Sequence, residues 1–410
     1  MSALLPRLRS DLDFMPSPVE DRPGLLIRDS LHYSESVLII PPALVECLSC
    51  FDGEQTTLDL RQLLVTITGD FQVGELEAGL MEALAQSGFL EDEVFLRMKA
   101  DRERAFAESP VREPAHAGSA YPDHEEELRG VIDAWMAEGP TAEPCAAATG
   151  REGILGIAAP HVSPQGGYES YRAAYRQLGP SLRDKTFVIL GTSHYGAAER
   201  FGLTRKDYRT PWGEARTDRA LVEELTRRAR PAIATEDYCH SFEHSIEFQV
   251  IFLQYLFGPN VRILPVLCGS YAHSIYLGGK PEADDAVNNF LDVLGDIAAR
   301  EGDRLRWVLG IDLAHIGRRY GDLFDATANR DEMQDVAARD RQRIDRVIAG
   351  DAAGFWDLVQ ENRDDLKWCG SSPLYTFLKA VPQARGAVER YEQWNIDEQS
   401  VVSFAGLSFR

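Results

Sequence analysis

The chain has 410 residues, and 43 Lys and Arg against 65 Asp and Glu give it a formal net charge of −22 at pH 7. A protein this acidic has no bulk attraction for nucleic acid or for an anionic membrane, because neutralising phosphates requires a basic face. Apolar residues make up 44% and charged residues 26%, which is an ordinary globular composition. We therefore expect no nucleic acid and no membrane among its partners, and a chain of two or three domains.

The apolar segments are too short to span a membrane, and residues 1–7 lack the layout of a signal peptide, which favours a cytoplasmic location. Six cysteines are too few for a disulfide scaffold in a chain of this length. A cysteine with a function here is therefore expected to be a metal ligand or a nucleophile.

The first hundred residues are the acidic part of the chain, with 7 Lys and Arg against 17 Asp and Glu. Their pattern predicts a hairpin and three helices, as in a small α+β unit of the winged-helix type. The expected strands are residues 24–28 and 37–40, and the expected helices are residues 42–49, 58–68 and 73–87. A charged, proline-containing stretch between residues 98 and 117 predicts a linker or a connecting helix. We place a boundary near residue 105, which gives domains 1–105 and 106–410.

From residue 153 onward, short apolar runs alternate with helical patterns, which predicts an α/β sheet covered by helices on both faces. The expected strands are residues 154–159, 186–190, 261–267, 306–311 and 401–409, and the expected helices are residues 168–178, 219–228, 242–257, 286–300, 333–349 and 373–380. A polar stretch around residues 139–153 predicts a loop inside this domain.

Three of the nine histidines follow predicted strands directly: His161, His194 and His315. A single histidine is more often hydrogen-bonded or exposed than functional. In open α/β sheets, however, the ligand crevice lies beyond the carboxyl ends of the strands, so three histidines in this position favour a site.

Cys369 lies in a loop before the last predicted helix, for which Ser372 is the expected N-cap and Pro373 the first helical residue. The positive end of a helix dipole favours a thiolate, the form that binds metals. The alternative is a buried cysteine that acts as a small apolar residue.

Residues 239–247 are rich in polar groups at the start of an apolar helix. His244 and Glu247 share a helix face, so the carboxylate could orient the imidazole, or both could point into the crevice. The alternative is helix capping by Ser241. Cys47 and Cys50 have the spacing of a zinc or redox pair, but no second pair lies nearby, so the pattern favours core packing.

Eight motifs occur in the order expected of Memo-like proteins, and this resemblance covers about residues 110–410. They are Arg112-Glu-Pro-Ala-His-Ala-Gly-Ser, Ala159-Pro-His with Gly167-Tyr, Gly191-Thr-Ser-His, Arg209-Thr-Pro-Trp-Gly, Glu243-His-Ser-Ile-Glu, Ile263-Leu-Pro-Val-Leu, Asp312-Leu-Ala-His and Cys369-Gly.

The Memo family resembles the catalytic subunits of class III extradiol dioxygenases, non-haem iron enzymes that cleave aromatic rings on a mixed α/β sheet. This resemblance implies that His161, His194 and Cys369 are metal ligands, with Cys369 where the ring-cleaving enzymes have a carboxylate. It implies that His315 is the acid/base histidine. Asp312 and His244 would join His315 in the catalytic pocket. Fe(II) is the metal that the resemblance implies, and a thiolate ligand brings in copper or zinc as alternatives.

The chain departs from the family pattern in three places. The usual Pro-His-Ala-Gly-Tyr is extended to Pro160-His-Val-Ser-Pro-Gln-Gly-Gly-Tyr, the usual His-His is His194-Tyr, and the usual Ser-Ser-Asp is Gly310-Ile-Asp. All three change the expected pocket wall and leave the expected ligands in place.

Residues 15–95 resemble the PqqD-like peptide-binding winged-helix family through Arg22-Pro-Gly-Leu, Phe51-Asp-Gly, Leu58-Asp-Leu and Gly88-Phe-Leu. Such domains take the leader of a precursor peptide as an added strand on a sheet edge. The acidic balance argues against DNA binding and permits a basic leader, and the alternative is a dimerisation or packing module.

These features predict a non-haem Fe(II)-dependent oxygenase or oxidase that acts on a peptide or a small aromatic substrate. One alternative is a non-catalytic Memo-like protein that binds peptides or proteins in the same crevice. Another is a hydrolase that uses Cys369 as its nucleophile with a histidine base.

Overall fold

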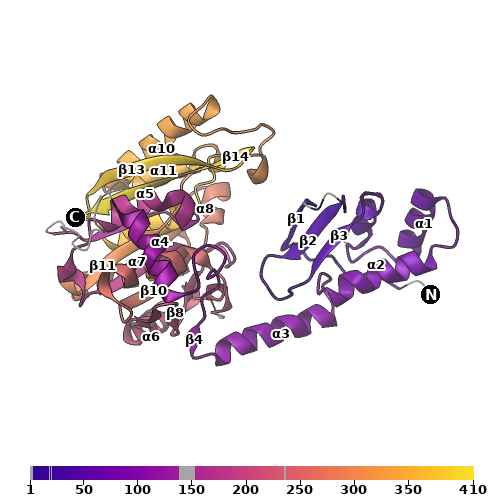
Figure 1. Cartoon of the computed structure of the whole chain (residues 1–410), viewed down its shortest axis with the longest axis horizontal. Coiled ribbons are helices and arrows are strands. Elements are labelled where there is room, and N and C mark those ends of the chain that lie inside the picture. Colours follow the sequence, from indigo (N-terminus) through magenta and orange to yellow (C-terminus); the bar gives the residue numbers. More distant parts are fainter. Residues whose placement is uncertain (1–2, 18, 20, 138–152, 235–236) are drawn as a thin grey trace. The chain divides into compact units, whose positions relative to one another are not determined.

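The computed structural model describes residues 3–17, 19, 21–137, 153–234 and 237–410. The chain divides into two compact units, Met1–Glu108 and Ser109–Arg410 (Figure 1). The loop expected around residues 139–153 lies outside the described residues except for its last residue. None of the helices in the described ranges combines the length and the apolar character needed to cross a bilayer.

The N-terminal unit is a three-stranded antiparallel sheet packed against helices, in the strand order β1-β2-β3. Its elements are β1 (Leu12–Pro16), β2 (Leu25–Asp29), β3 (Val37–Ile40), the 3-10 helix η1 (Pro42–Cys50), α1 (Thr57–Thr68), α2 (Gly74–Gln86) and α3 (Glu93–Glu108). The predicted hairpin and first three helices are confirmed. Cys47 and Cys50 are buried in the core of this unit, as the packing interpretation expected.

One strand of this unit was not predicted, and one expected helix begins earlier than expected. Strand β1 is a short edge strand, and it pairs antiparallel with β2 from Leu12 to Pro16. Of the two expectations for the charged stretch, the connecting helix is confirmed up to Glu108: α3 begins at Glu93, five residues before that stretch, and none of its residues is buried.

The C-terminal unit is built on an eleven-stranded mixed sheet in the order β12-β14-β5-β11-β6-β10-β9-β8-β4, to which β13 and β7 are attached. Its strands are β4 (Val111–Arg112), β5 (Gly156–Ala159), β6 (Thr186–Thr192), β7 (Phe201–Leu203), β8 (Asp207–Thr210), β9 (Gly213–Thr217), β10 (Arg262–Cys268), β11 (Leu305–Gly310), β12 (His315–Gly317), β13 (Gly386–Asp397) and β14 (Ser400–Phe409). The five predicted strands are confirmed. The long β13 was not predicted because its residues are mostly polar and half-exposed.

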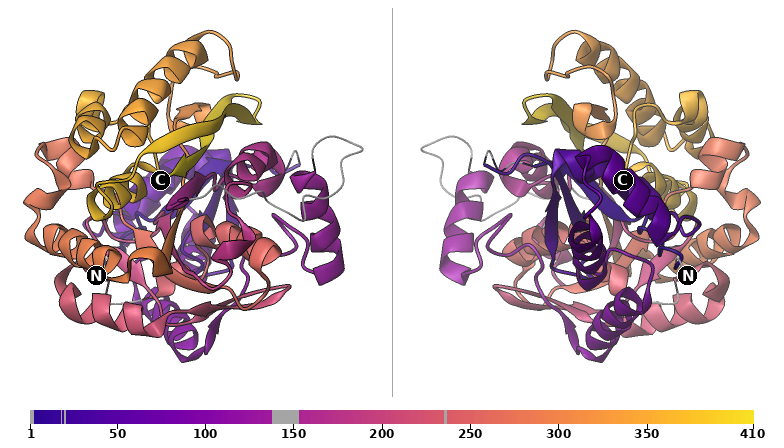
Figure 2. Two further views of the ribbon diagram at one scale, coloured as in Figure 1. Left: turned by 90° about the vertical axis from the view of Figure 1, so that its left-hand side faces the viewer. Right: turned by 90° about the vertical axis from the view of Figure 1, so that its right-hand side faces the viewer.

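Helices cover both faces of this sheet and enclose two separate hydrophobic cores (Figures 1 and 2). They are α4 (Glu125–Met136), α5 (Pro164–Tyr175), α6 (Arg219–Arg228), α7 (His244–Phe257), α8 (Ala272–Leu277), α9 (Asp285–Glu301), α10 (Glu332–Ile348), α11 (Ala352–Gln360) and α12 (Ser371–Ala380). The predicted mixed α/β class with a small N-terminal α+β unit is confirmed.

The order of the strands decides where the functional residues lie. Strands β5, β11 and β6 are parallel neighbours, with β11 between the other two. Their carboxyl ends therefore open on one edge of the sheet, and the histidines that follow them are brought to the same place.

Candidate metal centre

Three side chains from distant parts of the chain bring one potential metal ligand atom each to this edge. They are His161 after β5, His194 after β6 and Cys369 just before α12, and their ligand atoms all lie within 4.8 Å of one another. The Sγ atom of Cys369 lies 3.2 Å from Nε2 of His161. The structure thus brings together the three residues that the resemblance implied as ligands.

Two hydrogen bonds fix His161, one from its backbone N–H and one from ring nitrogen Nδ1, which is not the atom facing Cys369. Its Nδ1 lies 3.0 Å from the carbonyl oxygen of Gly310, which can only accept a hydrogen bond, so Nδ1 carries the proton. Its backbone N–H donates to Asp312 Oδ1 at 3.0 Å. The lone pair of neutral His161 is therefore on Nε2, on the side of Cys369.

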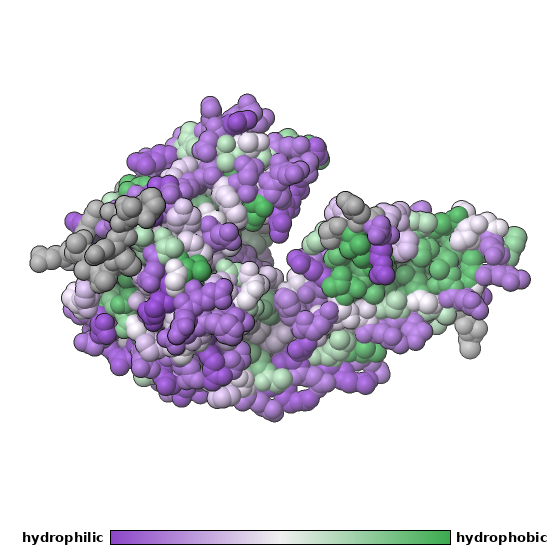
Figure 3. All heavy atoms as spheres, viewed as in Figure 1, coloured by the Kyte–Doolittle hydropathy of each residue, from purple (hydrophilic) through white to green (hydrophobic). Residues whose placement is uncertain are grey.

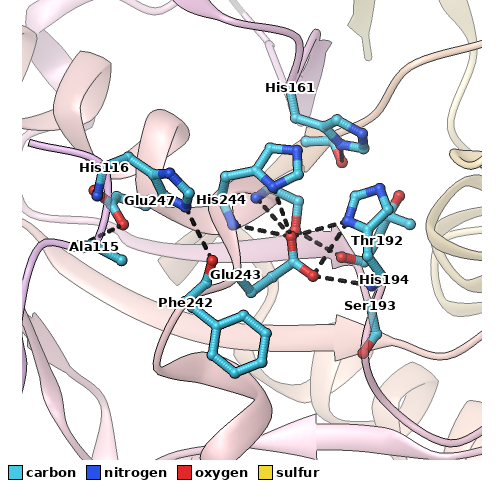
Figure 4. Close-up of polar contacts among 12 residues, drawn as sticks. Ala115, His116, His161, Thr192, Ser193, His194, Phe242, Glu243, His244 and Glu247 are labelled. Atoms are coloured by element: carbon cyan, nitrogen blue, oxygen red, sulfur yellow. Dashed lines mark hydrogen bonds and ion pairs between the residues drawn. The ribbon is translucent and has the colours of Figure 1, made fainter. Parts of the chain in front are cut away.

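His194 is oriented by Glu243, which sequence reasoning did not assign to the site. The Nδ1 of His194 lies 3.0 Å from Glu243 Oε1, and the backbone N–H of His194 donates to Oε2 at 2.9 Å. A carboxylate accepts here and Nδ1 donates, which leaves Nε2 as the free ligand atom. Figure 4 shows the carboxylate of Glu243 between the rings of His194 and His244.

Glu243 is also the N-cap of α7, and its side chain accepts hydrogen bonds from the backbone N–H groups of His244 and Ser245. The expected capping residue, Ser241, is therefore wrong by two positions. A carboxylate replaces the hydroxyl because the same group serves the helix and His194. The charge of His194 lowers the pKa of Glu243 against the effect of burial.

Cys369 approaches the cluster from a loop fixed to the strand ends. The backbone N–H of Gly370 donates to the carbonyl oxygen of Asp312 at 3.0 Å. Helix α12 begins at Ser371 with Gly370 as its N-cap, so the expected N-cap at Ser372 is two residues too late. Ser372 instead directs its hydroxyl to the carbonyl oxygen of Cys268 at 3.4 Å.

The protonation of Cys369 and His161 is coupled. Burial raises the pKa of the Cys369 thiol, but the charges of His161 and His315 and hydrogen bonds from His161 and His194 outweigh it and lower the pKa to about 5. Burial lowers the pKa of His161, whereas the charges of Asp312 and Cys369 raise it to about 9. Both shifts favour the thiolate form of Cys369, which is the form that binds a metal, and a bound metal would displace the proton from His161 Nε2.

His315 lies beside the cluster but outside its ligand set. Its Nδ1 is 2.9 Å from the carbonyl oxygen of Leu313 and 3.0 Å from that of Lys367, so Nδ1 carries a proton that both oxygens can accept. Asp312, expected in the same pocket, does not orient His315. Asp312 accepts from the backbone of His161 and Val162, while carbonyl oxygens orient His315.

His244 lies in the same cluster, with its ring stacked on His194 at 4.8 Å between centroids and 5.1 Å from His161. Burial lowers the pKa of His244 well below its usual value, so its ring is neutral. The proposed partnership of His244 with Glu247 is wrong. The carboxylate of Glu247 is bound by Arg112, by Tyr121 and by the backbone N–H groups of Ala115 and His116.

An apolar wall adjoins the cluster where the chain departs from the family pattern. Val162 directly follows His161 and packs with Val402 and Phe404. The ring of Tyr320, partly buried against the same residues, meets the ring of His315 edge to face at 4.9 Å. A small buried apolar group thus lies next to His161 and, through Tyr320, next to His315.

The donor set fits a transition metal with soft and borderline ligands. Two bonds of about 2.1 and 2.3 Å at a tetrahedral angle would place a nitrogen and a sulfur about 3.6 Å apart. The observed separation of 3.2 Å between His161 Nε2 and Cys369 Sγ is close to this value. Three ligands also leave further coordination positions for other molecules.

Glu243 could have been found from the sequence only by asking for an acceptor for His194. It stands immediately before His244 in a helix start, where an acidic residue is explained by the helix dipole alone. Its second role depends on the distance between β6 and α7, which no local pattern reports.

Comparison with known proteins gives the family. Residues 112–408 match the family model described as "Memo-like protein". A "MEMO1 family protein" of Aquifex aeolicus is 27% identical over 389 residues and covers 94% of this chain and 95% of its own length. A MEMO1 family protein of Methanopyrus kandleri is 30% identical over 318 residues, which is 73% of this chain and 99% of the relative.

The two coverages differ by about the N-terminal unit, since the Methanopyrus protein matches a share of the chain close to that of the C-terminal unit. Among solved structures, an uncharacterized protein from Escherichia coli K12 covers 62% of the chain at 10% identity with a TM-score of 0.37. That likeness is too low to add to the argument. The match over residues 112–408 shows that this chain belongs to the Memo-like protein family.

Proposed function

We propose that the chain is a cytosolic metalloprotein whose C-terminal unit binds one metal ion through His161 Nε2, His194 Nε2 and Cys369 Sγ. With Fe(II) it would act as a non-haem oxygenase or oxidase on a peptide or a small aromatic substrate. The observation that carries the proposal is the convergence of three ligand atoms within 4.8 Å, from residues separated by as many as 208 positions.

The remaining groups suit an oxidation at that metal. Bound Fe(II) would supply the electrons and open positions that oxygen chemistry requires. Glu243 and Gly310 hold the two imidazoles in the tautomer that binds metal. The apolar wall of Val162, Val402 and Phe404 would limit the access of water from the side of His161. Copper and zinc suit the same donors, and zinc would support binding without redox chemistry.

His315 is the proposed acid/base group. Because its Nδ1 proton is held by two carbonyl oxygens, Nε2 is the atom that could take a proton from a substrate and return it. His315→Ala should therefore leave the metal content unchanged and reduce turnover by about 100-fold or more. Loss of both metal and turnover would assign His315 to the ligand set or to the scaffold.

The metal assignment is tested by His194→Ala, with His124→Ala as the matched control because the side chain of His124 is 81% exposed. We expect purified His194→Ala to lose most of its bound metal, measured by mass spectrometry of the elements, and His124→Ala to retain it. An unchanged stoichiometry in His194→Ala would remove the residue from the ligand set.

Activity is tested on full-length protein loaded with Fe(II) under anaerobic conditions. On admission of oxygen, we expect oxygen consumption that depends on a peptide encoded near the gene or on a catechol. A protein that binds the peptide and consumes no oxygen with either substrate would favour the non-catalytic alternative.

One geometric feature favours the hydrolase alternative: a thiolate of lowered pKa lies 3.2 Å from an imidazole. That mechanism requires activity without metal. Alkylation of Cys369 would then abolish ester hydrolysis in metal-free protein, whereas the oxygenase proposal expects no such hydrolysis.

We further propose that the N-terminal unit docks a basic peptide as an added strand. Its sheet ends in β1 and β3, which both have a free edge among the described residues, and Phe14 and Val37 on these strands are 44% and 56% exposed. Figure 3 shows apolar surface gathered on this unit. Binding of a basic leader peptide should weaken with salt. A concentration-dependent dimer that binds no peptide would favour the packing alternative.

A further inference from the structure

Asp340 is a fully buried carboxylate in α10, outside the candidate metal centre. It accepts three hydrogen bonds from three different elements: Trp368 Nε1 at 2.6 Å, Tyr391 Oη at 2.7 Å and Ser403 Oγ at 2.6 Å. An ionised carboxylate is costly to bury, and it is retained only where its donors are well placed. The donors connect Asp340 to two segments of the candidate metal centre.

The first donor leads to the metal-ligand loop. Trp368 immediately precedes Cys369, and its indole N–H can only donate, so its bond to Asp340 fixes the ring. The backbone N–H of Trp368 donates to Asp364 Oδ2 at 3.1 Å, and Asp364 is paired with the buried Arg343 of α10. Helix α10 thus holds the residue before Cys369 at both ends.

Another donor, Ser403, leads to the segment that carries Asp312 and His315. The hydroxyl of Ser403 donates to Asp340 and accepts the backbone N–H of Ala314 at 2.9 Å. The backbone of Ser403 also exchanges hydrogen bonds with this segment, from Leu313 N at 2.8 Å and to the carbonyl oxygen of Ala314 at 2.9 Å.

The loop before Cys369 needs such support. Asn362, Arg363, Asp364 and Lys367 all have φ between 53° and 56°, the left-handed region that costs non-glycine residues energy. A loop with four such residues in a stretch of six keeps its shape only where its surroundings impose it.

We propose that Asp340 is a positioning residue that holds the Cys369 loop and the Asp312–His315 segment in register with each other, through Trp368 on one side and Ser403 on the other. The inference rests on the proposed function for its consequence at the metal. The positioning itself is a property of the metal-free protein. One carboxylate would therefore set the place of a metal ligand and of the acid/base histidine together.

The test uses full-length Asp340→Asn, which keeps the size of the side chain but can accept fewer hydrogen bonds. Trp368→Phe removes only the first connection and Ser403→Ala only the second. Asp345→Asn, on the same helix with a side chain that is 55% exposed, is the matched control.

In metal-free protein, hydrogen exchange by mass spectrometry should be faster in Asp340→Asn both around residues 366–370 and around residues 312–315. Trp368→Phe should affect only the first segment and Ser403→Ala only the second. If folded Asp340→Asn exchanges hydrogen in both segments at the same rate as the wild type, the inference is overturned. If Asp340→Asn does not fold, the two single-connection variants decide it by the same measurement.

The metal site is measured with Co(II), because a thiolate ligand gives bound Co(II) a sulfur-to-metal charge-transfer band in the absorption spectrum. We expect Asp340→Asn to weaken Co(II) binding by about 10- to 100-fold and to shift this band. Substitutions of residues that support metal ligands from behind commonly have an effect of this size on affinity. A purely structural role would lower stability and leave the band and affinity of the folded protein unchanged, which would also overturn the inference. Failure of the wild-type protein to bind Co(II) would count against the proposed metal site, and the exchange data would still decide the role of Asp340.

Discussion

Each of the two units buries charged groups, and the two clusters are satisfied in opposite ways. In the N-terminal unit, Arg9 is 2% exposed and all five of its N–H donors have acceptors, on Asp11, Asp29 and Gly88. Its guanidinium also lies 4.0 Å from the centre of the Phe95 ring. Nothing remains on Arg9 with which to bind another molecule.

In the C-terminal unit, the buried ring of His161 and the ring of His194, whose side chain is 27% exposed, each use one nitrogen on a protein oxygen and turn the other toward Cys369 and the shared cluster. The N-terminal arrangement, the Arg9 clasp, joins the segment before β1 to Asp29 at the end of β2 and to Gly88 after α2. The C-terminal arrangement has ligand atoms that no protein group uses up in the part of the chain that the structure describes. Burial of a charged group alone therefore does not mark a site, whereas a ring with one nitrogen held by the protein and one coordinating atom left over does.

The largest effect should come from breaking the N-terminal clasp. Arg9→Met leaves the carboxylate of Asp29 buried without its cation, and we expect a loss of about 3–5 kcal/mol in the free energy of unfolding of that unit. Urea denaturation followed by hydrogen exchange in residues 3–108 measures it. The metal content should not change, because every group of the candidate site belongs to the other unit.

Arg28→Met is the matched control. Arg28 pairs with Asp13 on the same sheet, but the two side chains are 50% and 39% exposed, so the loss should stay below about 1 kcal/mol. Equal losses for Arg9→Met and Arg28→Met would show that the buried clasp has no special weight.

A smaller effect is expected at the residue that connects scaffold and site. The carboxylate of Glu243 accepts from four N–H groups, two of His194 and one each of His244 and Ser245. The single amide oxygen of Glu243→Gln cannot accept from all four, so His194 loses its fixed orientation. We expect metal affinity to fall by about 10- to 100-fold. Competitive titration with a chelator measures this change directly.

Glu199→Gln is the control for Glu243→Gln, because Glu199 is a buried carboxylate that contacts His273 away from the cluster. Its metal affinity should equal that of the wild type. A similar loss in both variants would mean that general destabilisation, and not the orientation of His194, weakens the site.

How much the sequence predicts differs between the two units for a physical reason. In the C-terminal unit, the strands that precede His161 and His194 are wholly buried, so apolar runs in the sequence reveal them. The site is then found because ligands bind beyond the carboxyl ends of such strands. In the N-terminal unit, the edge strand Leu12–Pro16 and the polar helix Glu93–Glu108 have no such runs.

The partners of the site residues were harder to predict than the residues themselves. Asp340 and Trp368 are 28 positions apart, and Glu243 and His194 are 49 apart. Such pairings depend on how α10 and α7 pack against the sheet. The two misplaced N-caps also involve tertiary partners: the cap of α7 is Glu243, whose carboxylate also accepts from His194, and Ser372 directs its hydroxyl to the carbonyl oxygen of Cys268. The N-cap of α12 is Gly370, which makes no side-chain cap.

The smallest effect is expected where charge is paired outside both clusters. Glu224 accepts two hydrogen bonds from Arg300, at 2.7 and 2.8 Å, and one from Arg228 at 3.0 Å. The hydrogen bonds from Arg300 lower the pKa of Glu224 to about 2, with Arg228 assisting against a smaller effect of burial. Because the folded-state pKa is below the unfolded value, this pair stabilises the protein above about pH 4.5 and loses its effect as the pH falls toward 2.

Glu224→Gln mimics the protonated carboxyl group, so it should lower the free energy of unfolding by about 1 kcal/mol or less at pH 7. The difference from wild type should shrink between about pH 4.5 and 2, and also in 1 M salt, because the pair lies near the surface. Urea midpoints at several pH values measure both trends. A difference in the free energy of unfolding that persists at pH 2 would mean that Glu224 contributes through packing and not through its charge. This pair near the surface would then stabilise the protein in the way expected only of the buried Arg9 clasp.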